Sequence, residues 1–347
     1  MENGTAEPAT TEALGACELN DPVQFVLVPL VYCLVLVVGL PGNLVALLAF
    51  LQRGRVRKAI RIYLINLTLA DILFNLTLPL WIPYYLARGR WALSDAICRL
   101  AGATYYMATY SAITFMALIS VNRYCTVRVT MLDLALNRRH GAVAACVMVW
   151  LLCLGCAIPT LVTRQTWESS GGTSCFEQHA GHKNYAYAMV GFFAASFLVV
   201  LGAYVSILRS LSATATTSHG NHRRLARAMV LGMVLVFVVC VAPYHLTLAP
   251  WVAGRPRAPS CGPPSSLDIL HSLSVALLSL NSCIDPLIYC FSIKRFRADL
   301  GDLLPTDVSC LPGPWQEVGR SRCDPNGLLT CLSQAAWTDP ALVHCHP

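Results

Sequence analysis

The chain has 347 residues, of which 56% are hydrophobic and only 12% are charged, and its mean hydropathy is +0.56. These values lie far from those of soluble globular proteins and indicate an integral membrane protein. The formal net charge of +7 requires no nucleic-acid partner, because basic residues gather in the cytoplasmic loops of membrane proteins and contact anionic lipid there.

Residues 1–23 contain no Lys or Arg and no short apolar stretch followed by a cleavage site. We therefore expect an extracellular tail over 1–23 without a cleaved signal peptide, and the first span would act as the insertion signal. Asn3-Gly4-Thr5 is an N-glycosylation sequon in this tail, so Asn3 is the predicted acceptor.

Seven apolar segments follow, each long enough for the roughly 20 residues with which a helix crosses the hydrocarbon. They cover residues 24–51, 60–86, 96–127, 140–161, 184–210, 224–251 and 267–290. The loops between them are too short to hold a second core, so the predicted fold class is an all-α membrane protein with a seven-transmembrane helix bundle. With the N-terminus extracellular, 18 of the 25 Lys and Arg lie in cytoplasmic segments, which predicts a cytoplasmic C-terminus.

Polar residues and prolines interrupt these spans. A charge at membrane depth costs roughly 3 kcal/mol or more and is usually kept for function, whereas a proline frees a backbone carbonyl and lets its helix bend. The seventh span carries both, at Asp285 and Pro286, and the pair predicts a conformational switch. The candidate switch residues are Asp71, Asn122, Arg123, Tyr124, Tyr204, Phe237, Pro243, Asn281, Asp285, Pro286 and Tyr289.

Aromatic side chains gather near the outer level of the bundle, where no acid lies deep between the helices. Aromatic faces attract a quaternary ammonium by about 0.5–2 kcal/mol per good contact, and His245 or His271, with Arg164 or Lys183 of the second outer loop, would suit a phosphate. Anchoring at the membrane interface is an equally good interpretation of any one Tyr or Trp. The candidate ligand-binding residues are Trp81, Tyr84, Tyr85, Tyr105, Tyr106, Tyr244, His245, Leu248, Trp251 and His271, with Tyr185 and Tyr187 at the same level.

The topology divides the sixteen cysteines into two groups. Only Cys17, Cys98, Cys175 and Cys261 face the oxidising side, and four cysteines allow three pairings. Of these we expect Cys98–Cys175 and Cys17–Cys261, each holding an outer loop over the bundle. Cysteines within the spans are interpreted as packing residues. Two loops carry paired histidines without a clear third ligand, so we expect no bound metal and no cofactor.

The C-terminal part divides at residue 300. Residues 291–300 have the pattern of a short amphipathic cytoplasmic helix 8, with Phe291 and Phe296 toward lipid. Residues 301–347 show no periodic pattern of apolar residues, which predicts a disordered cytoplasmic tail. Cys310 is the predicted lipidation site in this tail. The membrane domain is therefore expected over 24–300.

Over residues 24–300 the sequence resembles the rhodopsin-like (class A) G-protein-coupled receptors. The landmarks that carry the resemblance are, in order, Gly42-Asn43, Leu69-Ala70-Asp71, Asn122-Arg123-Tyr124, Trp150, Tyr204, Phe237 with Pro243, and Asp285-Pro286 with Tyr289. The resemblance implies a plasma-membrane receptor that couples to a heterotrimeric G protein, with arrestin and receptor kinases as further partners. It also implies that Arg123 contacts the G-protein α subunit when the sixth span moves outward.

Within this family, the motifs are most similar to those of receptors for the phosphocholine ether lipid platelet-activating factor. They are Asn66 to Asp71, Thr77 to Tyr85, Trp91 with Cys98, Asn122-Arg123-Tyr124, Pro243-Tyr244-His245 with Pro250-Trp251, and Lys294 to Arg297. This similarity implies a small lipid (phospholipid) agonist and signalling to calcium, phosphoinositide or cyclic AMP pathways. The chain departs from those receptors at Gly191, Tyr244 and Leu248.

The resemblance also places Asp71, Asn281 and Asp285 in one polar core, which binds sodium in many relatives. Because Ala112 stands where those relatives have a hydroxyl, and because two acids lie close together, we expect one acid to be protonated instead. Asn122 replaces the acid that restrains Arg123 in relatives, and Val241 replaces a tryptophan near the hinge at Pro243.

Two other ligand classes stay open. Tyr244-His245 and the expected disulfides also resemble the purine-nucleotide receptors, although a nucleotide wants several convergent cations. A chemokine or other peptide would use both disulfides, yet the outer half of the seventh span offers no acid to a basic ligand. Outside the receptor class, no internal repeat indicates a transporter, and no nucleophile motif, metal set or nucleotide loop indicates an enzyme.

Overall fold

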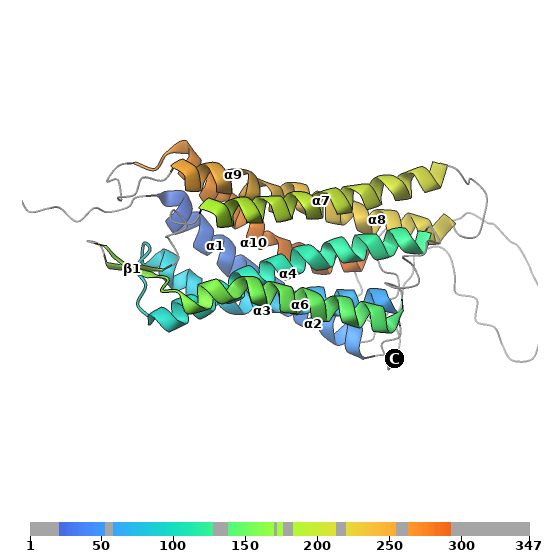
Figure 1. Ribbon diagram of the computed structural model, residues 1–347, viewed down its shortest axis with the longest axis horizontal. Coiled ribbons are helices and arrows are strands. Elements are labelled where there is room, and N and C mark those ends of the chain that lie inside the picture. The colour runs from blue at the N-terminus through green and yellow to red at the C-terminus, as the bar shows by residue number, and fades with distance from the viewer. Residues whose placement is uncertain are drawn as a thin grey trace, which may run out of the picture. The chain divides into compact units, whose positions relative to one another are not determined.

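A computed structural model describes residues 21–52, 58–127, 138–169, 172–175, 183–212, 220–254 and 263–292. Each of the seven predicted spans is helical in it, and the helices run alongside one another (Figure 1). Several predictions lie outside the described residues, namely the Cys17–Cys261 disulfide, glycosylation at Asn3, lipidation at Cys310, most of helix 8 and the tail over 301–347.

The helix bounds follow the predicted spans closely. The first span is continuous from Val23 to Leu51, with π-helical turns at Val23–Leu27 and Val35–Gly39 before α1 (Val28–Leu34) and α2 (Leu40–Leu51). The remaining helices are α3 (Ala59–Leu86), α4 (Asp95–Val127), α6 (Arg139–Val162), α7 (Lys183–Ser212), α8 (Gly220–Val236), a π-helical turn at Phe237–Val241, α9 (Ala242–Gly254) and α10 (Ser266–Ser292).

Six of these helical spans are long and apolar enough to cross a membrane, and α4 is the more polar seventh. Its neighbours explain the difference, because α4 packs against α3, α6, α7 and α8 and is therefore largely surrounded by protein. Its hydroxyls also donate to backbone carbonyls one turn earlier, as Thr109 does to Tyr105 at 2.8 Å and Thr114 to Tyr110 at 2.7 Å. A helix whose hydroxyls make such hydrogen bonds can lie within the membrane, where other helices rather than lipid surround it.

A β-hairpin crosses one end of the bundle, which we call the hairpin end. Strands β1 (Thr166–Ser169) and β2 (Gly172–Cys175) are antiparallel, with Thr166 opposite Cys175. The sequence had indicated only a loop here. The Cys98–Cys175 disulfide, one of the two expected, ties β2 to the start of α4. The opposite end, which carries Arg123, is called the Arg123 end.

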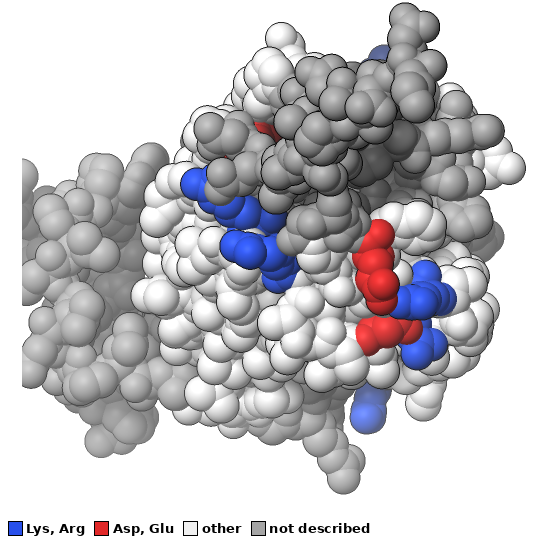
Figure 2. Space-filling view, turned by 90° about the vertical axis from the view of Figure 1, so that its left-hand side faces the viewer, with Lys and Arg blue, Asp and Glu red and all other residues white. Residues whose placement is uncertain are grey.

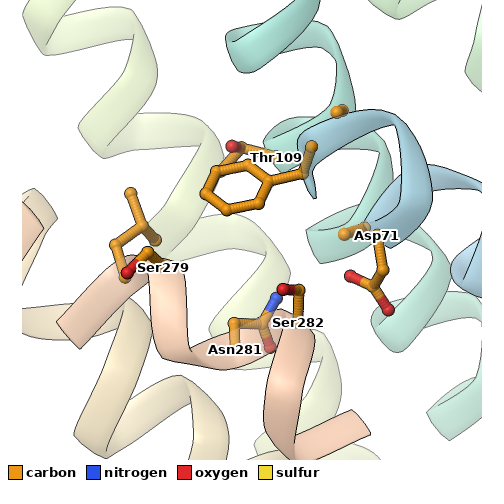
Figure 3. A pocket seen from close by; sticks show the side chains of 9 residues that line it. Asp71, Thr109, Ser279, Asn281 and Ser282 are labelled. Carbon is orange, nitrogen blue, oxygen red and sulfur yellow. The ribbon is translucent and has the colours of Figure 1, made fainter. Parts of the chain in front are cut away.

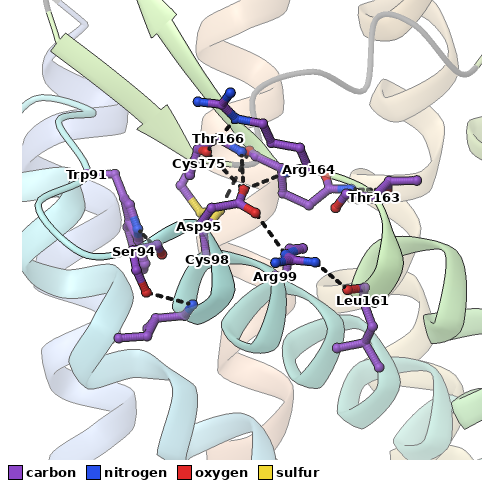
Figure 4. Close-up of polar contacts among 12 residues, drawn as sticks. Trp91, Ser94, Asp95, Cys98, Arg99, Leu161, Thr163, Arg164, Thr166 and Cys175 are labelled. Carbon is purple, nitrogen blue, oxygen red and sulfur yellow. Dashed lines mark hydrogen bonds and ion pairs between the residues drawn. A yellow bond between two sulfur atoms is a disulfide. The ribbon is translucent and has the colours of Figure 1, made fainter.

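Asp95 joins the hairpin to α4 through a dense set of polar contacts (Figure 4). Its Oδ1 accepts hydrogen bonds from the backbone N–H groups of Gln165 and Thr166, both at 3.0 Å, and from the Thr166 hydroxyl at 2.8 Å. Its Oδ2 lies 2.8 Å from Nε of Arg99, which also donates to the carbonyl of Leu161. Partial burial opposes ionisation, but these donors outweigh it and hold the pKa of Asp95 below its usual range.

The face at the hairpin end shows basic and acidic side chains close together (Figure 2). Two ion pairs contribute here, Arg99 with Asp95 and the more exposed Arg164 with Glu168 at 3.6 Å. Cations on this face that have carboxylate partners are less available to an anionic ligand.

We predict that Asp95→Asn destabilises the purified protein by about 1–2 kcal/mol at neutral pH, because it weakens charge-assisted hydrogen bonds. A carboxyl group whose pKa is lower in the folded state than in the unfolded state stabilises the fold in full above its unfolded-state pKa of about 3.9. This stabilisation is lost as the pH falls through the folded-state pKa. Wild type should therefore lose its advantage over Asp95→Asn below about pH 4.

Thermal unfolding in nanodiscs across pH measures this effect. The control is Glu168→Gln, which removes the longer and more exposed ion pair and should change stability by less than about 1 kcal/mol. Equal losses in both variants would show that Asp95 contributes no more than an ordinary surface charge.

Candidate functional site

The polar core predicted from the sequence is assembled at mid-depth between α3 and α10. Asn75 donates to the Ser282 hydroxyl at 3.1 Å and to the carbonyl of Asp71 at 2.8 Å. Asn43 of α2 donates to the carbonyl of Ser282 at 2.7 Å. The first, second and seventh spans are therefore joined at the turn that precedes Pro286.

A close backbone approach supports this junction. A Cβ added at Gly39 would lie 3.1 Å from the Cys283 sulfur and 3.2 Å from Oδ1 of Asn75. Only the absence of a side chain at residue 39 lets the first and seventh spans pack this tightly.

A small cavity of about 10 Å³ adjoins the junction (Figure 3). Asp71 and Asn281 line it together with side chains of α3, α4 and α10, namely Phe74, Ala108, Thr109, Ala112, Leu278, Ser279 and Ser282. Oδ1 of Asn281 is buried and has no hydrogen-bond partner among the described residues. A buried polar cavity with an unsatisfied oxygen is a site for ordered water.

Asp71 and Asp285 are each 1% exposed and lie close enough to interact electrostatically, and Oδ2 of each has no hydrogen-bond partner among the described residues. Two buried carboxylates this close repel each other, which favours a proton on one of them. Ala112 lies on the cavity wall and supplies no oxygen, as the sequence indicated.

The hinge predicted at Pro243 coincides with a break in helical regularity. The turn from Phe237 to Val241 is π-helical, and α9 begins at Ala242. A proline cannot donate to the preceding turn, and π-helical turns often accommodate that loss. Phe237, which is fully buried, stacks near Phe193 and Phe197 of α7 at 6.2 Å from each.

The predicted ligand-binding aromatics form two neighbouring groups at the hairpin-end half of the bundle. The first surrounds Trp81, which lies 5.8 Å from Tyr84, 5.8 Å from Trp91 and 6.2 Å from Tyr105. The second surrounds Tyr244, and Tyr105 contacts Tyr106 between the two. Most of these side chains are below 10% exposed, so a ligand that bound between them would have to displace rings from one another.

Tyr187 does not join either group. Its side chain is 56% exposed, which places it on the outside of α7 where lipid would lie. The interface-anchor interpretation therefore fits Tyr187.

His245 is committed to contacts inside the protein. Its Nδ1 lies 2.9 Å from the carbonyl of Val241, which can only accept, so Nδ1 carries the proton. Nε2 lies 3.0 Å from the Tyr110 hydroxyl, and the ring stacks on Phe193 at 4.6 Å. The neutral tautomer thus has partners at both nitrogens, and this histidine is poorly placed to meet a phosphate.

His271 occupies a more superficial position between α9 and α10. The Thr247 hydroxyl donates to the carbonyl of Pro243, and the Ser274 hydroxyl donates to the carbonyl of His271. Nδ1 of His271 lies 3.0 Å from the Thr247 hydroxyl, which is also 3.0 Å from the Ser274 hydroxyl. The ring stacks on Trp251 at 4.2 Å, and Trp251 in turn donates to Asp268 at 2.9 Å.

At the Arg123 end, two methionines of α8 close the bundle against α4. Nε of Arg123 lies 3.3 Å from the Met229 sulfur, and the Ser120 hydroxyl lies 3.3 Å from the Met233 sulfur. No carboxylate of a described residue lies within ion-pair distance of Arg123.

The other predicted switch residues lie nearby. Asn122 and Tyr289 are buried, Tyr124 and Tyr204 are partly buried, and the Tyr289 ring packs on Phe50 at 5.5 Å. Within the part of the chain that the structure describes, Arg123 thus contacts a weak sulfur acceptor and makes no ion pair.

Several site residues were not predicted from the sequence. Tyr110 and Phe193 hold His245, Ser282 and Asn75 connect the polar core, and Met229 receives Arg123. Tyr110 could have been predicted from the sequence, since it lies one helical turn from Tyr106. Contacts of Ser282 and Met229 depend on how distant helices pack, which no local spacing encodes.

Comparison with known proteins identifies relatives over most of the chain. The family described as "7 transmembrane receptor (rhodopsin family)" matches residues 42–289. The Platelet-activating factor receptor of Cavia porcellus is 31% identical and covers 84% of this chain and 90% of the relative. G-protein coupled receptor 183 of Mus musculus is 30% identical, with 89% and 91% covered. A purinoceptor of Rattus norvegicus is 29% identical, with 85% and 84% covered.

We predict that Asp285→Asn keeps the fold stable to within about 1 kcal/mol, because the amide can donate to Asp71 as a protonated Asp285 would. Asp285→Leu, by contrast, should cost about 2 kcal/mol or more, since it leaves Asp71 buried without its partner. Thermal unfolding of the two purified variants measures the difference. A loss in Asp285→Asn as large as that in Asp285→Leu would rule out a proton between the two acids.

Proposed function

Because the chain belongs to the rhodopsin family of seven-transmembrane receptors, we propose that it is a plasma-membrane receptor activated by an extracellular lipid mediator. The proposed agonist is a phosphocholine ether phospholipid similar to platelet-activating factor. The protein is a multi-pass receptor rather than an enzyme, and its family acts through heterotrimeric G proteins. Signalling to calcium, phosphoinositide or cyclic AMP pathways, and binding of arrestin and receptor kinases, belong to the same proposal.

The proposed orientation puts the hairpin end outside the cell. Disulfides form and persist in oxidising compartments, and Cys98–Cys175 lies at this end. The opposite end carries basic side chains of the described helix ends, including Lys58, Arg138 and Arg209, as the positive-inside rule requires for the cytoplasmic side.

The two groups of aromatic side chains are the observation that supports a lipid agonist. A phosphocholine headgroup needs ring faces for its quaternary ammonium, and its acyl or ether chain needs apolar surface. The rings around Trp81 and Tyr244 provide both. His271, at the outer edge of the second group, is better placed than His245 to approach the phosphate.

The competing ligand classes fit less well. A nucleotide needs several cations that converge on its phosphates, but Arg99 and Arg164, on the hairpin-end face, are paired with Asp95 and Glu168. The relatives do not separate the classes by identity, because the rat purinoceptor lies within two percentage points of the platelet-activating factor receptor. For a basic peptide, Asp268 is the acid at the start of α10, and Trp251 and Ser265 already donate to it.

Activation is proposed to shift the population between two arrangements of the sixth span. A ligand that separates the rings around Tyr244 would move α9 about the irregular turn before Pro243. At the far end, α8 would then swing away from α4 and break the contact between Arg123 and Met229. The released Arg123 would contact the G-protein α subunit.

A ligand panel tests the proposed agonist class. Cells that express the receptor are exposed to ether phospholipids, lysophospholipids, nucleotides and chemokines, and calcium release and cyclic AMP are recorded. We expect a response to the phosphocholine ether lipids. Trp251→Leu should weaken that response about 2- to 30-fold, the range of one cation–π contact.

The matched control is Tyr187→Leu, which removes an exposed ring from the outside of α7 and should leave potency unchanged. A response confined to nucleotides would replace the proposed ligand with the purine class. A response that Tyr187→Leu weakens as much as Trp251→Leu would contradict the placement of the site between the helices.

We predict that Asn122→Asp lowers ligand-free signalling, because it supplies a carboxylate beside an arginine whose acceptor among the described residues is a sulfur. An added ion pair worth about 1 kcal/mol shifts a closed-to-open ratio about fivefold. Basal nucleotide exchange on G protein, measured at matched surface expression, reports the change. Arg123→Ala is the companion variant, which should bind agonist normally and fail to stimulate exchange. Unchanged or raised basal exchange in Asn122→Asp would contradict the proposed restraint.

A further inference from the structure

Gly232 lies in α8, in the part of the sixth span that packs against both α4 and α10 toward the Arg123 end. A Cβ added at residue 232 would lie 3.3 Å from Cγ1 of Ile288 and 3.4 Å from both its Cγ2 and its Cδ1. Favourable contacts between carbon atoms are about 3.5–4.0 Å long. The two helices therefore lie closer together here than any side chain at residue 232 would allow, and we call this contact the Gly232 notch.

Ile288 cannot readily give way to a larger side chain in the notch. It is 8% exposed, and both branches of its side chain lie within 3.4 Å of the added Cβ. A β-branched residue in a helix keeps essentially one χ1 rotamer. A methyl group at residue 232 would therefore have to be accommodated by movement of one of the two helices.

The polar contacts of the two helices indicate that α8 would move before α10. On α10, the carbonyl of Ser282 accepts from Asn43 at 2.7 Å and its hydroxyl accepts from Asn75 at 3.1 Å, which fixes this helix to the first and second spans. On α8, the contacts with α4 include the sulfurs of Met229 and Met233, each 3.3 Å from its donor. A thioether is a weak acceptor, so the interface of α8 with α4 separates at the smaller cost.

The sixth and seventh spans are joined differently at their hairpin-end halves. There the Thr247 hydroxyl lies 3.0 Å from Nδ1 of His271, and the Trp251 indole donates to Asp268 at 2.9 Å. These contacts tie α9 to α10, whereas the irregular turn at Phe237–Val241 separates α9 from α8. Strain at the notch would therefore tilt α8 at this turn while α9 keeps its contacts.

We propose that the Gly232 notch sets the resting position of the sixth span. Ile288, packed against the bare backbone of residue 232, holds α8 on α10, and a side chain at residue 232 shifts the population toward the arrangement in which α8 has left α4. That this arrangement is the signalling one rests on the proposed function. The contact itself requires neither an agonist nor a G protein.

Oxidation of Met229 and Met233 by hydrogen peroxide measures how often α8 leaves α4. The two side chains are 0% and 1% exposed, and peroxide transfers one oxygen atom to a thioether, which gives the sulfoxide and water. The purified full-length protein in nanodiscs is treated without agonist or G protein, and mass spectrometry follows each methionine. We expect Gly232→Ala to raise both oxidation rates about fivefold or more, because overpacking strain shifts a two-state ratio by that factor.

The matched control is Gly202→Ala on α7, where an added Cβ would meet no atom within 4 Å, and it should oxidise as wild type does. Met189 of α7, which is 4% exposed, is the internal standard in every variant. Ile288→Leu keeps the side-chain volume but removes the branch at Cβ, so in that background Gly232→Ala should have a much smaller effect.

Unchanged oxidation in Gly232→Ala, an equal rise at Met189, or a rise that Ile288→Leu leaves undiminished would each overturn the proposal. If Gly232→Ala alone does not fold, the double variant with Ile288→Ala should fold, because it frees space for the added methyl group; a double variant that also fails would count against the notch. Since no signalling is measured, these outcomes are separate from whether the ligand panel identifies an agonist.

Discussion

The structure depends on one constraint: in a lipid-surrounded bundle, each polar group must find its partner inside the protein. Asn43, Asn75 and Ser282 meet much of this constraint together, because each contributes a donor or an acceptor to the same junction of the first, second and seventh spans. One oxygen each of Asp71, Asn281 and Asp285 has no such partner among the described residues, which is why this core suits a bound proton or ordered water. An unsatisfied polar group there would cost several kcal/mol. The same constraint places α4, the most polar long helix, where four others surround it.

The two ends of the bundle are held by interactions of very different strength. At the hairpin end, a disulfide and the charge-assisted hydrogen bonds of Asp95 fix the hairpin onto α4. At the Arg123 end, α4 and α8 meet through methionine sulfurs, which are weak acceptors. Among the described residues, the contacts that hold the hairpin on α4 are therefore stronger than the polar contacts between α4 and α8.

Much of this arrangement followed from the sequence, since hydropathy and isolated charges obey local rules. All seven spans, the polar core around Asp71 and Asp285 and the Cys98–Cys175 bond were predicted from spacing, topology or resemblance, and the structure contains them. The β-hairpin and the role of Asp95 were not predicted, because a short outer loop shows no periodic pattern of apolar residues. His245 shows the same limit: composition suggested a phosphate contact, whereas packing against Tyr110 and Phe193 commits both of its nitrogens to the protein.

The loss of the family's tryptophan at Val241 can be understood from the rings around it. Phe193 lies 4.6 Å from His245, which follows Pro243, and 6.2 Å from Phe237, the first residue of the irregular turn that precedes Pro243. One ring of α7 therefore touches both sides of the hinge in the sixth span. If a ligand shifts the rings that contact His245, the displacement reaches Phe237 through Phe193 without a large side chain at residue 241, because close-packed rings cannot move independently.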